Sequence, residues 1–470
     1  MEQADQKKKF KFKIPHTYII IGIIIVVAMI LTYVVPAGQF DRVEDPATGR
    51  TIVVEGSYHK VEQSPVNPFR MFIAIQEGMI DSADIIFFIL FAYGFVYMQI
   101  KTGAFDGAVG ELLRKMGGKE KYLIPVFMTL FGICGSTFGM YEETYGLLPA
   151  FIGMAMALGY DGLVGGAIVV VGVATGFAAA TFNPFTLGVA QGIAELPLFS
   201  GWQFRAIIFV AFEGLSIWYV MRYAAKVKAN PDASYVKGVN FAVAEGRSRE
   251  ELLKAPFTAR HKVSMLLFLI TIVLIIVGTI KLGWYINELA AVFIIMMIIV
   301  GLIGKLTMSE IASAFVEAAS DAVFGAVVVG LARAVLIIME NGCIIDTVVY
   351  ALSNSVSTSS KYISALLMLV VQNLTNFFIP SGSGQAATSM PIMAPLADML
   401  GVTRQTATLA FQFGDGFSNM FWPTAVATEC GLMGLPIDKW YKFITPLFVM
   451  MLVFQAIFIV ISVAIGFGPF

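Results

Sequence analysis

Four short polar segments interrupt the apolar stretches of this chain of 470 residues. Their residues are 135–144 (GSTFGMYEET), 181–186 (TFNPFT), 380–385 (PSGSGQ) and 414–419 (GDGFSN). A helix that is interrupted inside a bilayer leaves backbone N–H and C=O groups unpaired. Each such group costs roughly several kcal/mol unless water, a ligand or a side chain satisfies it. Because packing does not explain four breaks at related positions, they predict a binding site at membrane depth.

The segment 380–385 is rich in hydrogen-bond donors. A half-helix that begins near Ser383 or Gln385 would point its positive end and its free N–H groups at the tip, where a carboxylate would bind favourably. The hydroxyl groups of Ser381 and Ser383 add donors. A flexible surface loop is the alternative, but this segment lies inside an apolar stretch and has a counterpart in the first half of the chain.

The counterpart segment is acidic instead. An offset of 242 residues aligns Glu143 with Gln385, and Glu142 precedes it. Carboxylates at membrane depth are expensive and indicate function by default. An acidic tip opposite a tip rich in N–H groups suits a zwitterion or a cationic amino acid better than a dicarboxylate. The alternative is that both glutamates line the cytoplasmic mouth or bind a structural partner such as Arg333.

Oxygen-bearing side chains near Asp415 could bind a coupling ion, because hard cations prefer carboxylate, amide and carbonyl oxygens. Na⁺ coupling, H⁺ coupling and exchange without an ion all remain open. The residues predicted to bind substrate are Ser136, Thr137, Glu142, Glu143, Asn183, Thr186, Ser381, Ser383, Gln385, Asn419 and Thr424. The residues predicted to couple a cation or proton are Asp415, Ser418 and Glu143.

The elements that position these residues occur twice, with the second copy 239 to 242 positions after the first. The recurring residues include helix breakers: Pro149, Gly159, Gly176 and Pro184 correspond to Pro391, Gly401, Gly416 and Pro423. In a hydrophobic chain, such a repeat is typical of a secondary transporter whose site lies between two related halves. The distribution of Lys and Arg in short loops gives the halves opposite orientations, which predicts an inverted repeat.

Composition sets the fold class. With 58% hydrophobic and 13% charged residues and a mean hydropathy of +0.80, the chain is predicted to be an all-α polytopic membrane protein. The sequence has no basic cluster large enough to suggest a nucleic-acid partner. It also lacks a Walker A motif, which argues against an ATP-driven pump. The three histidines fall near water-exposed segments, and the three cysteines set no metal-ligand spacing. We therefore expect no catalytic residue, metal or cofactor, and the chain is not expected to be an enzyme.

We expect about nine transmembrane helices and two re-entrant hairpins. The expected segments are a cytoplasmic N-terminus (1–16), a first repeat (17–224) with a hairpin at 122–160, a cytoplasmic linker (225–262), an unpaired connecting helix (263–283), and a second repeat (284–470) with a hairpin at 362–400. A re-entrant hairpin is tolerated at membrane depth where its tip is buried in protein or faces a cavity.

Over nearly its whole length, and above all in the four polar segments, the chain resembles the YfcC family. That family looks related to the DcuC C4-dicarboxylate carriers and the AbgT transporters of the ion transporter superfamily. The resemblance implies a homodimer of scaffold and transport domains, in contact with lipids of the bacterial cytoplasmic membrane. It also implies a site between two opposed hairpins and elevator-type movement.

The resemblance also suggests a small-molecule substrate. YfcC-like proteins are usually regarded as amino-acid carriers, including arginine–ornithine exchangers. The alternative is a transporter of C4-dicarboxylates or other organic anions, coupled to Na⁺ or H⁺. A channel is disfavoured because the polar groups concentrate near mid-membrane instead of forming a continuous path.

Overall fold

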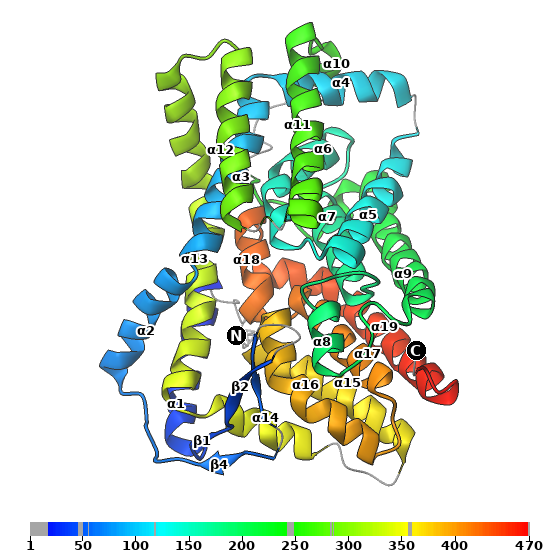
Figure 1. The fold of residues 1–470 in the computed structure, drawn as a ribbon. Coiled ribbons are helices and arrows are strands. Elements are labelled where there is room, and N and C mark those ends of the chain that lie inside the picture. Colours follow the sequence, from blue (N-terminus) through cyan, green and yellow to red (C-terminus); the bar gives the residue numbers. More distant parts are fainter. Residues whose placement is uncertain are drawn as a thin grey trace, which may run out of the picture.

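The computed structural model describes residues 17–45, 50–54, 56–116, 119–241, 249–282, 284, 286–355 and 360–468. These residues are mainly helical (Figure 1). The predicted cytoplasmic N-terminus, 1–16, lies outside the described residues, as do positions 242–248 of the predicted linker.

The first half and the linker contain these helices: α1 (Thr17–Val34), α2 (Pro68–Asp81), α3 (Ala83–Lys101), α4 (Ala104–Met116), η1 (Glu120–Tyr122), α5 (Leu123–Ile133), η2 (Cys134–Phe138), η3 (Glu142–Leu147), α6 (Leu148–Ala157), α7 (Gly162–Ala178), α8 (Leu187–Ile193), α9 (Trp202–Ala229), η4 (Pro231–Ala233) and α10 (Arg249–Lys254). Of the η elements here, η2 is a π-helix and the others are 3-10 helices.

The second half contains α11 (Ala259–Val277), the π-helix η6 (Gly278–Leu282), α12 (Ile286–Ile303), α13 (Met308–Asn341), α14 (Ile345–Asn354), α15 (Lys361–Phe378), α16 (Gly382–Met399), α17 (Arg404–Gly416), the 3-10 helix η7 (Ser418–Met420), α18 (Pro423–Met433) and α19 (Ile437–Ala464). In the order of the chain, each long helix of the first half from α2 onward has a counterpart here.

Side-chain caps fix where several helices begin. The side chain of Asn67 accepts a hydrogen bond from the backbone of Arg70, and Pro68 occupies the first helical position of α2. Thr307 and Glu310 form a reciprocal capping box at the start of α13. Asp161 caps α7 by accepting from the N–H of Val164 at 3.0 Å. These local signals place the helix starts independently of the tertiary packing.

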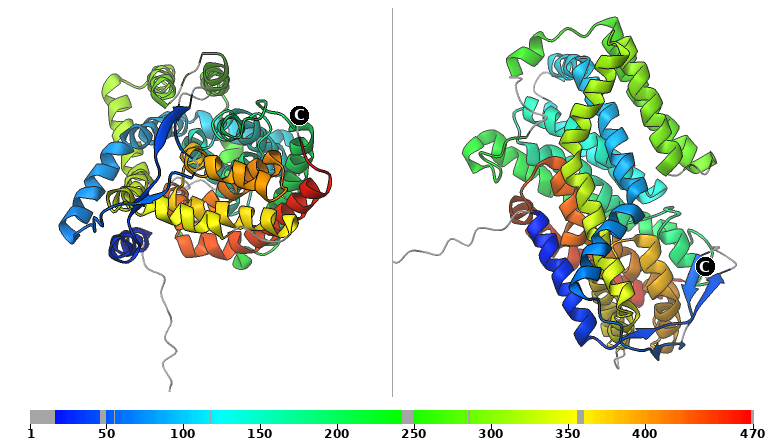
Figure 2. Two further views of the ribbon diagram at one scale, coloured as in Figure 1. Left: turned by 60° about the horizontal axis from the view of Figure 1, so that its bottom comes forward. Right: turned by 90° about the vertical axis from the view of Figure 1, so that its left-hand side faces the viewer.

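The two halves run in opposite directions, as Figure 2 shows for α3 and α13. A Cβ placed on Gly78 would meet the backbone at Gly330 and Ala334, whereas one on Gly94 would meet Phe315. Gly78 in α2 therefore contacts a late position in α13, whereas Gly94, further along the chain in α3, contacts an earlier one. Helices α2 and α3 are thus antiparallel to α13. The structure thus has the predicted inverted repeat, with one difference: α13 continues unbroken for 34 residues where the first half breaks between α2 and α3.

The described strands form two small antiparallel pairs between α1 and α2. Strand β1 (Gly38–Gln39) pairs with β4 (His59–Lys60), and β2 (Arg42–Asp45) pairs with β3 (Arg50–Val53). The registers place Gly38 opposite Lys60 and Arg42 opposite Val53. Asp346 on α14 anchors this region, because it binds Arg42 at 2.7 Å and accepts from the N–H of Phe40 at 3.0 Å.

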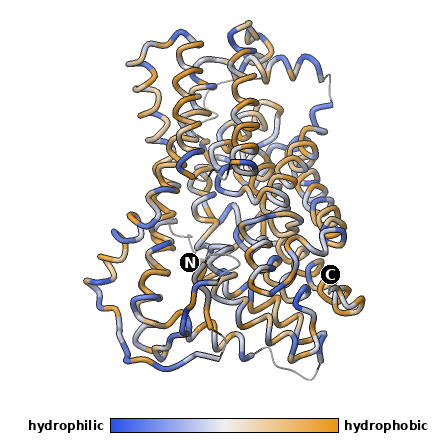
Figure 3. The backbone as a smooth tube through the Cα atoms, viewed as in Figure 1, coloured by the Kyte–Doolittle hydropathy of each residue, from blue (hydrophilic) through white to orange (hydrophobic). Residues whose placement is uncertain are grey.

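Six helices among the described residues are long and apolar enough to cross a membrane, and two shorter apolar helices accompany them. Hydrophobic colouring extends along most of the helices in Figure 3, and hydrophilic colouring marks the strands. All of α7 and nearly all of α17 are buried; α7 is apolar along its length, whereas α17 carries several polar side chains. Helix α7 ends just before the polar segment 181–186, and α17 ends within the polar segment 414–419.

Candidate functional site

The tip of the first hairpin is shaped by Gly139 and Asn183. Gly139 has a φ of +67°, and a Cβ there would lie 2.5 Å from Oδ1 of Asn183, so glycine is required. The same Asn183 oxygen accepts hydrogen bonds from the backbone of Phe185 at 2.9 Å and of Thr186 at 3.2 Å. Asn183 therefore supports the interrupted backbone between α7 and α8 and is not among the cavity-lining residues.

Ser136 and Thr137 also satisfy the backbone. The Ser136 hydroxyl donates to the carbonyl of Ala179 at 2.8 Å and lies 3.1 Å from the Thr181 hydroxyl. The Thr137 hydroxyl donates to the carbonyl of Ile133 at 2.6 Å. The structure thus brings Ser136 to the break after α7, and neither residue is among those that line the cavity.

The two adjacent glutamates of this tip are in different environments. Glu143 turns back on its own segment, where its Oε2 accepts from the backbone N–H of Tyr141 at 2.9 Å. Glu142 is exposed to the cavity and, among the described residues, makes no hydrogen bond or ion pair with another side chain. Of the two glutamates, Glu142 is therefore the one that faces the cavity without a partner on another described side chain.

The second hairpin presents the start of α16 to the cavity. Ser381 caps this helix, and its Oγ accepts from a backbone N–H in the first turn at 3.4 Å. Ser381 and Ser383 both line the cavity. Gln385 is fully buried, and its Nε2 donates to the carbonyl oxygen and to Oε1 of Gln372, each at 2.8 Å. Gln385 thus joins the two arms of the hairpin and is not a cavity-lining residue.

Asp415 lies behind the tip of the second hairpin. It is fully buried, and its Oδ1 accepts from Nδ2 of Asn376 at 3.1 Å. Ser418 donates to Oδ1 of the same Asn376 at 2.6 Å. The other oxygen of Asp415 has no hydrogen-bond partner among the described residues and would lie 2.9 Å from a Cβ on Gly382. The absence of a side chain at Gly382 therefore lets the hairpin tip approach this carboxylate.

Three further predicted residues lie at the edge of the cavity. Thr186, Asn419 and Thr424 all line it and are at least nine-tenths buried. The Thr424 hydroxyl donates to the carbonyl of Phe377 at 3.0 Å. In the described part of the chain, Thr186 Oγ1 and Asn419 Oδ1 have no hydrogen-bond partner.

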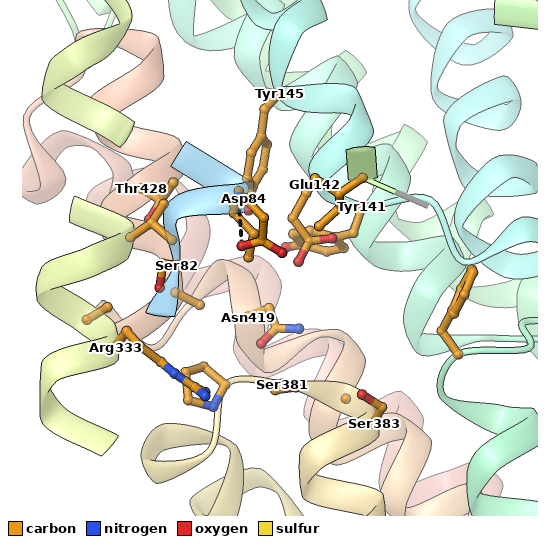
Figure 4. Close-up of a pocket in the computed structure, with 18 of the residues that line it drawn as sticks. Ser82, Asp84, Tyr141, Glu142, Tyr145, Arg333, Ser381, Ser383, Asn419 and Thr428 are labelled. Atoms are coloured by element: carbon orange, nitrogen blue, oxygen red, sulfur yellow. Dashed lines mark hydrogen bonds between the residues drawn. The ribbon is translucent and has the colours of Figure 1, made fainter. Parts of the chain in front are cut away.

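These residues surround a cavity of about 370 Å³ between α2, α3, η3, α13, α16, η7 and α18 (Figure 4). Its volume is at the lower end of the range for small-molecule sites, roughly 300 to 1,000 Å³. The predicted site residues that line it are Glu142, Glu143, Thr186, Ser381, Ser383, Asn419 and Thr424. Ser136, Thr137, Asn183, Gln385, Asp415 and Ser418 are not among the lining residues.

The side of the cavity formed by α2, α3 and α13 lies outside the predicted polar segments. Asp81, Ser82 and Asp84 lie at the break between α2 and α3, and Arg333 projects from α13. The guanidinium Nε of Arg333 donates to Asp81, so this arginine pairs with Asp81 and with neither glutamate. In the sequence, this side of the cavity is marked by two acids and a serine within four residues at the start of an apolar span.

A second contact outside the predicted polar segments joins α18 to the first hairpin. The hydroxyl of Tyr141 donates to Oε1 of Glu429 at 2.7 Å. Glu429 is 1% exposed, and its Oε2 has no hydrogen-bond partner among the described residues. In the sequence, this contact is marked by Glu429, a charged residue inside an apolar stretch. No group of three or more His, Cys, Asp and Glu in the described ranges could hold a metal ion.

The family model of DcuC, the C4-dicarboxylate anaerobic carrier, matches residues 14–464. The chain belongs to the DcuC family. A relative of this chain, YfcC of Escherichia coli (strain K12), has a name that proposes a basic amino acid antiporter. It is 31% identical over 478 residues, which cover 93% of this chain and 94% of YfcC. The predicted resemblance to YfcC is thereby confirmed.

Other proteins are similar to this chain over most of its length. An uncharacterized protein of Haemophilus influenzae (strain ATCC 51907 / DSM 11121 / KW20 / Rd) is 30% identical over 508 residues and covers 99% of both chains. The YdaH transporter of Alcanivorax borkumensis has a TM-score of 0.43 and 15% identity, over 97% of this chain and 100% of its own. MtrF of Neisseria gonorrhoeae has a TM-score of 0.42 and 16% identity, over 96% and 95%. This DcuC-family chain is a multi-pass membrane transporter.

Proposed function

We propose that this transporter is a secondary active carrier of amino acids with a cationic side chain, of the arginine and ornithine type, and that it exchanges them across the bacterial cytoplasmic membrane. The charge of the cavity carries this proposal. Four acids line it, namely Asp81, Asp84, Glu142 and Glu143. Among the described lining residues the basic side chain is Arg333, and Asp81 already neutralises it. An excess of carboxylates at membrane depth favours a cation.

The opposite wall of the cavity supports a substrate that also carries a carboxylate. Ser381 and Ser383 line the cavity at the start of α16, where hydroxyl groups, free N–H groups and the helix dipole favour an anion. An amino acid would place its carboxylate there and its cationic side chain toward Glu142. A C4-dicarboxylate would instead bring its second negative charge to Glu142, where like charges repel.

The names of the relatives differ in what they suggest. The name of YfcC proposes a basic amino acid antiporter, which agrees with the charge of the cavity. The name of the matching family refers to C4-dicarboxylates, so a dicarboxylate remains the alternative. Substrate class is therefore the first property to test.

Asp415, Ser418 and the nearby oxygens of Thr186 and Asn419 are the proposed site of a coupling cation or proton. Two of their features support this role: they are at least nine-tenths buried, and Asp415 Oδ2, Thr186 Oγ1 and Asn419 Oδ1 have no hydrogen-bond partner among the described residues. Na⁺ would use these hard oxygen ligands, whereas H⁺ would use the carboxylate alone. A purely exchanging carrier would need neither ion.

We also propose that the protein has a scaffold and a transport domain that move relative to each other by an elevator mechanism. The packing of its helices into two groups supports this proposal. Helices α2, α3, α12 and α13 pack against one another, and the two hairpins pack against α7 and α17. The cavity lies where these groups meet. We further propose that the scaffold forms a homodimer in the membrane.

The test is exchange in proteoliposomes that contain the purified protein. Vesicles loaded with unlabelled ornithine should accumulate labelled arginine, and vesicles without internal substrate should accumulate far less. Protein-free vesicles give the background. Succinate uptake without arginine uptake would show that the carrier takes dicarboxylates and would overturn the proposed function.

A further inference from the structure

Asp84 is an acid of the cavity that no predicted motif contains. It lies in the first turn of α3, and its side chain is exposed to the cavity. Its Oδ1 accepts from the neighbouring backbone N–H of Ile85 at 2.8 Å, which leaves Oδ2 free among the described residues. Helix α3 packs directly against η3, the segment that carries Glu142. Asp84 therefore faces the tip of the first hairpin from the proposed scaffold.

The carboxylates of Asp84 and Glu142 turn toward the same part of the cavity, as Figure 4 shows. Both residues line the same cavity, where like charges repel one another. Neither makes an ion pair among the described residues, and the nearby Arg333 is engaged by Asp81. A cation placed between the two carboxylates would relieve this repulsion and receive charge-assisted hydrogen bonds from both sides.

The repeat shows that the fold itself does not require an acid at this position. Asp81 has Asp321 as its counterpart 240 residues later, but the same offset aligns Asp84 with Phe324. The ring of Phe324 stacks on that of Tyr18 with centroids 4.9 Å apart. At this position of the repeat, α13 therefore carries the apolar Phe324, whereas α3 carries the carboxylate of Asp84. Asp84 lines the cavity.

We propose that Asp84 and Glu142 together bind the cationic group of the substrate as a two-carboxylate clamp across the proposed boundary between scaffold and transport domain. This inference rests on the proposed function. A guanidinium group has five N–H donors in a planar fork, so it can bind both carboxylates at once. An ammonium group has three donors and less reach. The clamp therefore selects arginine over ornithine.

A simpler role for Asp84 is stabilisation of α3, because an acid in the first turn of a helix interacts favourably with the helix dipole. The two roles differ in their consequences. A helix-start charge affects stability alone, whereas a ligand of the substrate affects affinity in proportion to the charge of that substrate.

The experiment compares the wild type, Asp84→Asn, Glu142→Gln and the double variant in detergent. Binding of arginine, ornithine and citrulline is measured by calorimetry, and melting temperatures are recorded alongside. Citrulline has nearly the shape of arginine without its charge. Asn keeps an oxygen that can accept from Ile85, so the start of α3 is preserved. Should Asp84→Asn fail to fold, Asp84→Ser supplies a hydroxyl acceptor in its place.

We expect each single variant to weaken arginine binding at least tenfold, with a smaller loss for ornithine and almost none for citrulline. The double variant should lose less than the product of the two single losses, because both carboxylates bind the same group. Unchanged arginine affinity in Asp84→Asn, or an equal loss for citrulline, would overturn the clamp. Failure of the wild type to bind any cationic amino acid would instead overturn the proposed function.

Discussion

At the scale of single residues, Glu142 and Glu143 show how neighbours in sequence acquire different roles. Glu143 accepts from the N–H of Tyr141 at 2.9 Å and thereby closes the turn of its own hairpin. Glu142 has no side-chain partner among the described residues and is exposed to the cavity. The sequence placed both acids at the tip but could not tell which one faces a substrate, because that depends on the 3-10 geometry of η3.

The different roles of the two glutamates lead to a paired prediction. Glu142→Gln removes a charged partner of the substrate, a contact worth about 1.5 to 3 kcal/mol, so the KM for arginine should rise about 10- to 100-fold. Glu143→Gln keeps an oxygen that can accept from Tyr141, and its KM should change by less than about threefold. Initial rates of exchange in proteoliposomes measure both. A larger effect in Glu143→Gln would assign the substrate to the other carboxylate.

At the scale of elements, the second hairpin depends on a close approach at Gly382. A Cβ there would lie 2.4 Å from Cγ2 of Thr186 and 2.9 Å from Oδ2 of Asp415. A Cβ on Gly384 would come no closer than 3.2 Å to its neighbours, the nearest being Oγ of Ser381. Both glycines lie in the first turn of α16, so they form a matched pair for substitution.

We expect Gly382→Ala to lower the melting temperature and to reduce exchange strongly. Overpacking costs roughly 1 to 3 kcal/mol, and the added methyl would push the start of α16 away from Asp415. Gly384→Ala should fold and transport nearly as well as the wild type. Scanning fluorimetry and exchange assays check the pair. Equal behaviour of the two variants would mean that the hairpin tip does not depend on this approach.

Sequence patterns predicted the elements more fully than the contacts between them. The inverted repeat, the helical class and the four polar breaks follow from hydropathy and from recurring Pro and Gly residues, which are local properties. The roles of Asn183 and Gln385 did not follow from the sequence. Asn183 accepts from backbone N–H groups within its own break, which depends on the folded shape of that break, and Gln385 donates to Gln372 on the other arm of the hairpin. Asp84 and Glu429 were missed because their significance arises from α3 and α18 packing against the first hairpin.

At the scale of the whole molecule, we assign α18 to the proposed transport domain, because its Glu429 accepts from Tyr141 of the first hairpin. The proposed elevator movement then requires α18 to slide along α13. The two helices meet at glycines: a Cβ on Gly431 would lie 2.7 Å from Cα of Gly325, and one on Gly325 would lie 2.5 Å from Cγ of Leu432. Small residues allow such close contact between helices in membranes. Leu432 is 4% exposed here, and α13 covers it. Movement of the transport domain would uncover this side chain during each cycle.

We therefore expect Leu432→Cys, in a background with the native cysteines replaced by serine, to react with a small maleimide at a rate that changes severalfold when arginine is added. Leu409→Cys on α17 is the matched control, because Leu409 is 1% exposed within the proposed transport domain and should stay protected. Labelling is followed by mass spectrometry of protein in proteoliposomes. If Leu432→Cys is as protected as Leu409→Cys with and without arginine, then α18 does not slide along α13. Alternating access would in that case have to come from movements of the hairpins alone.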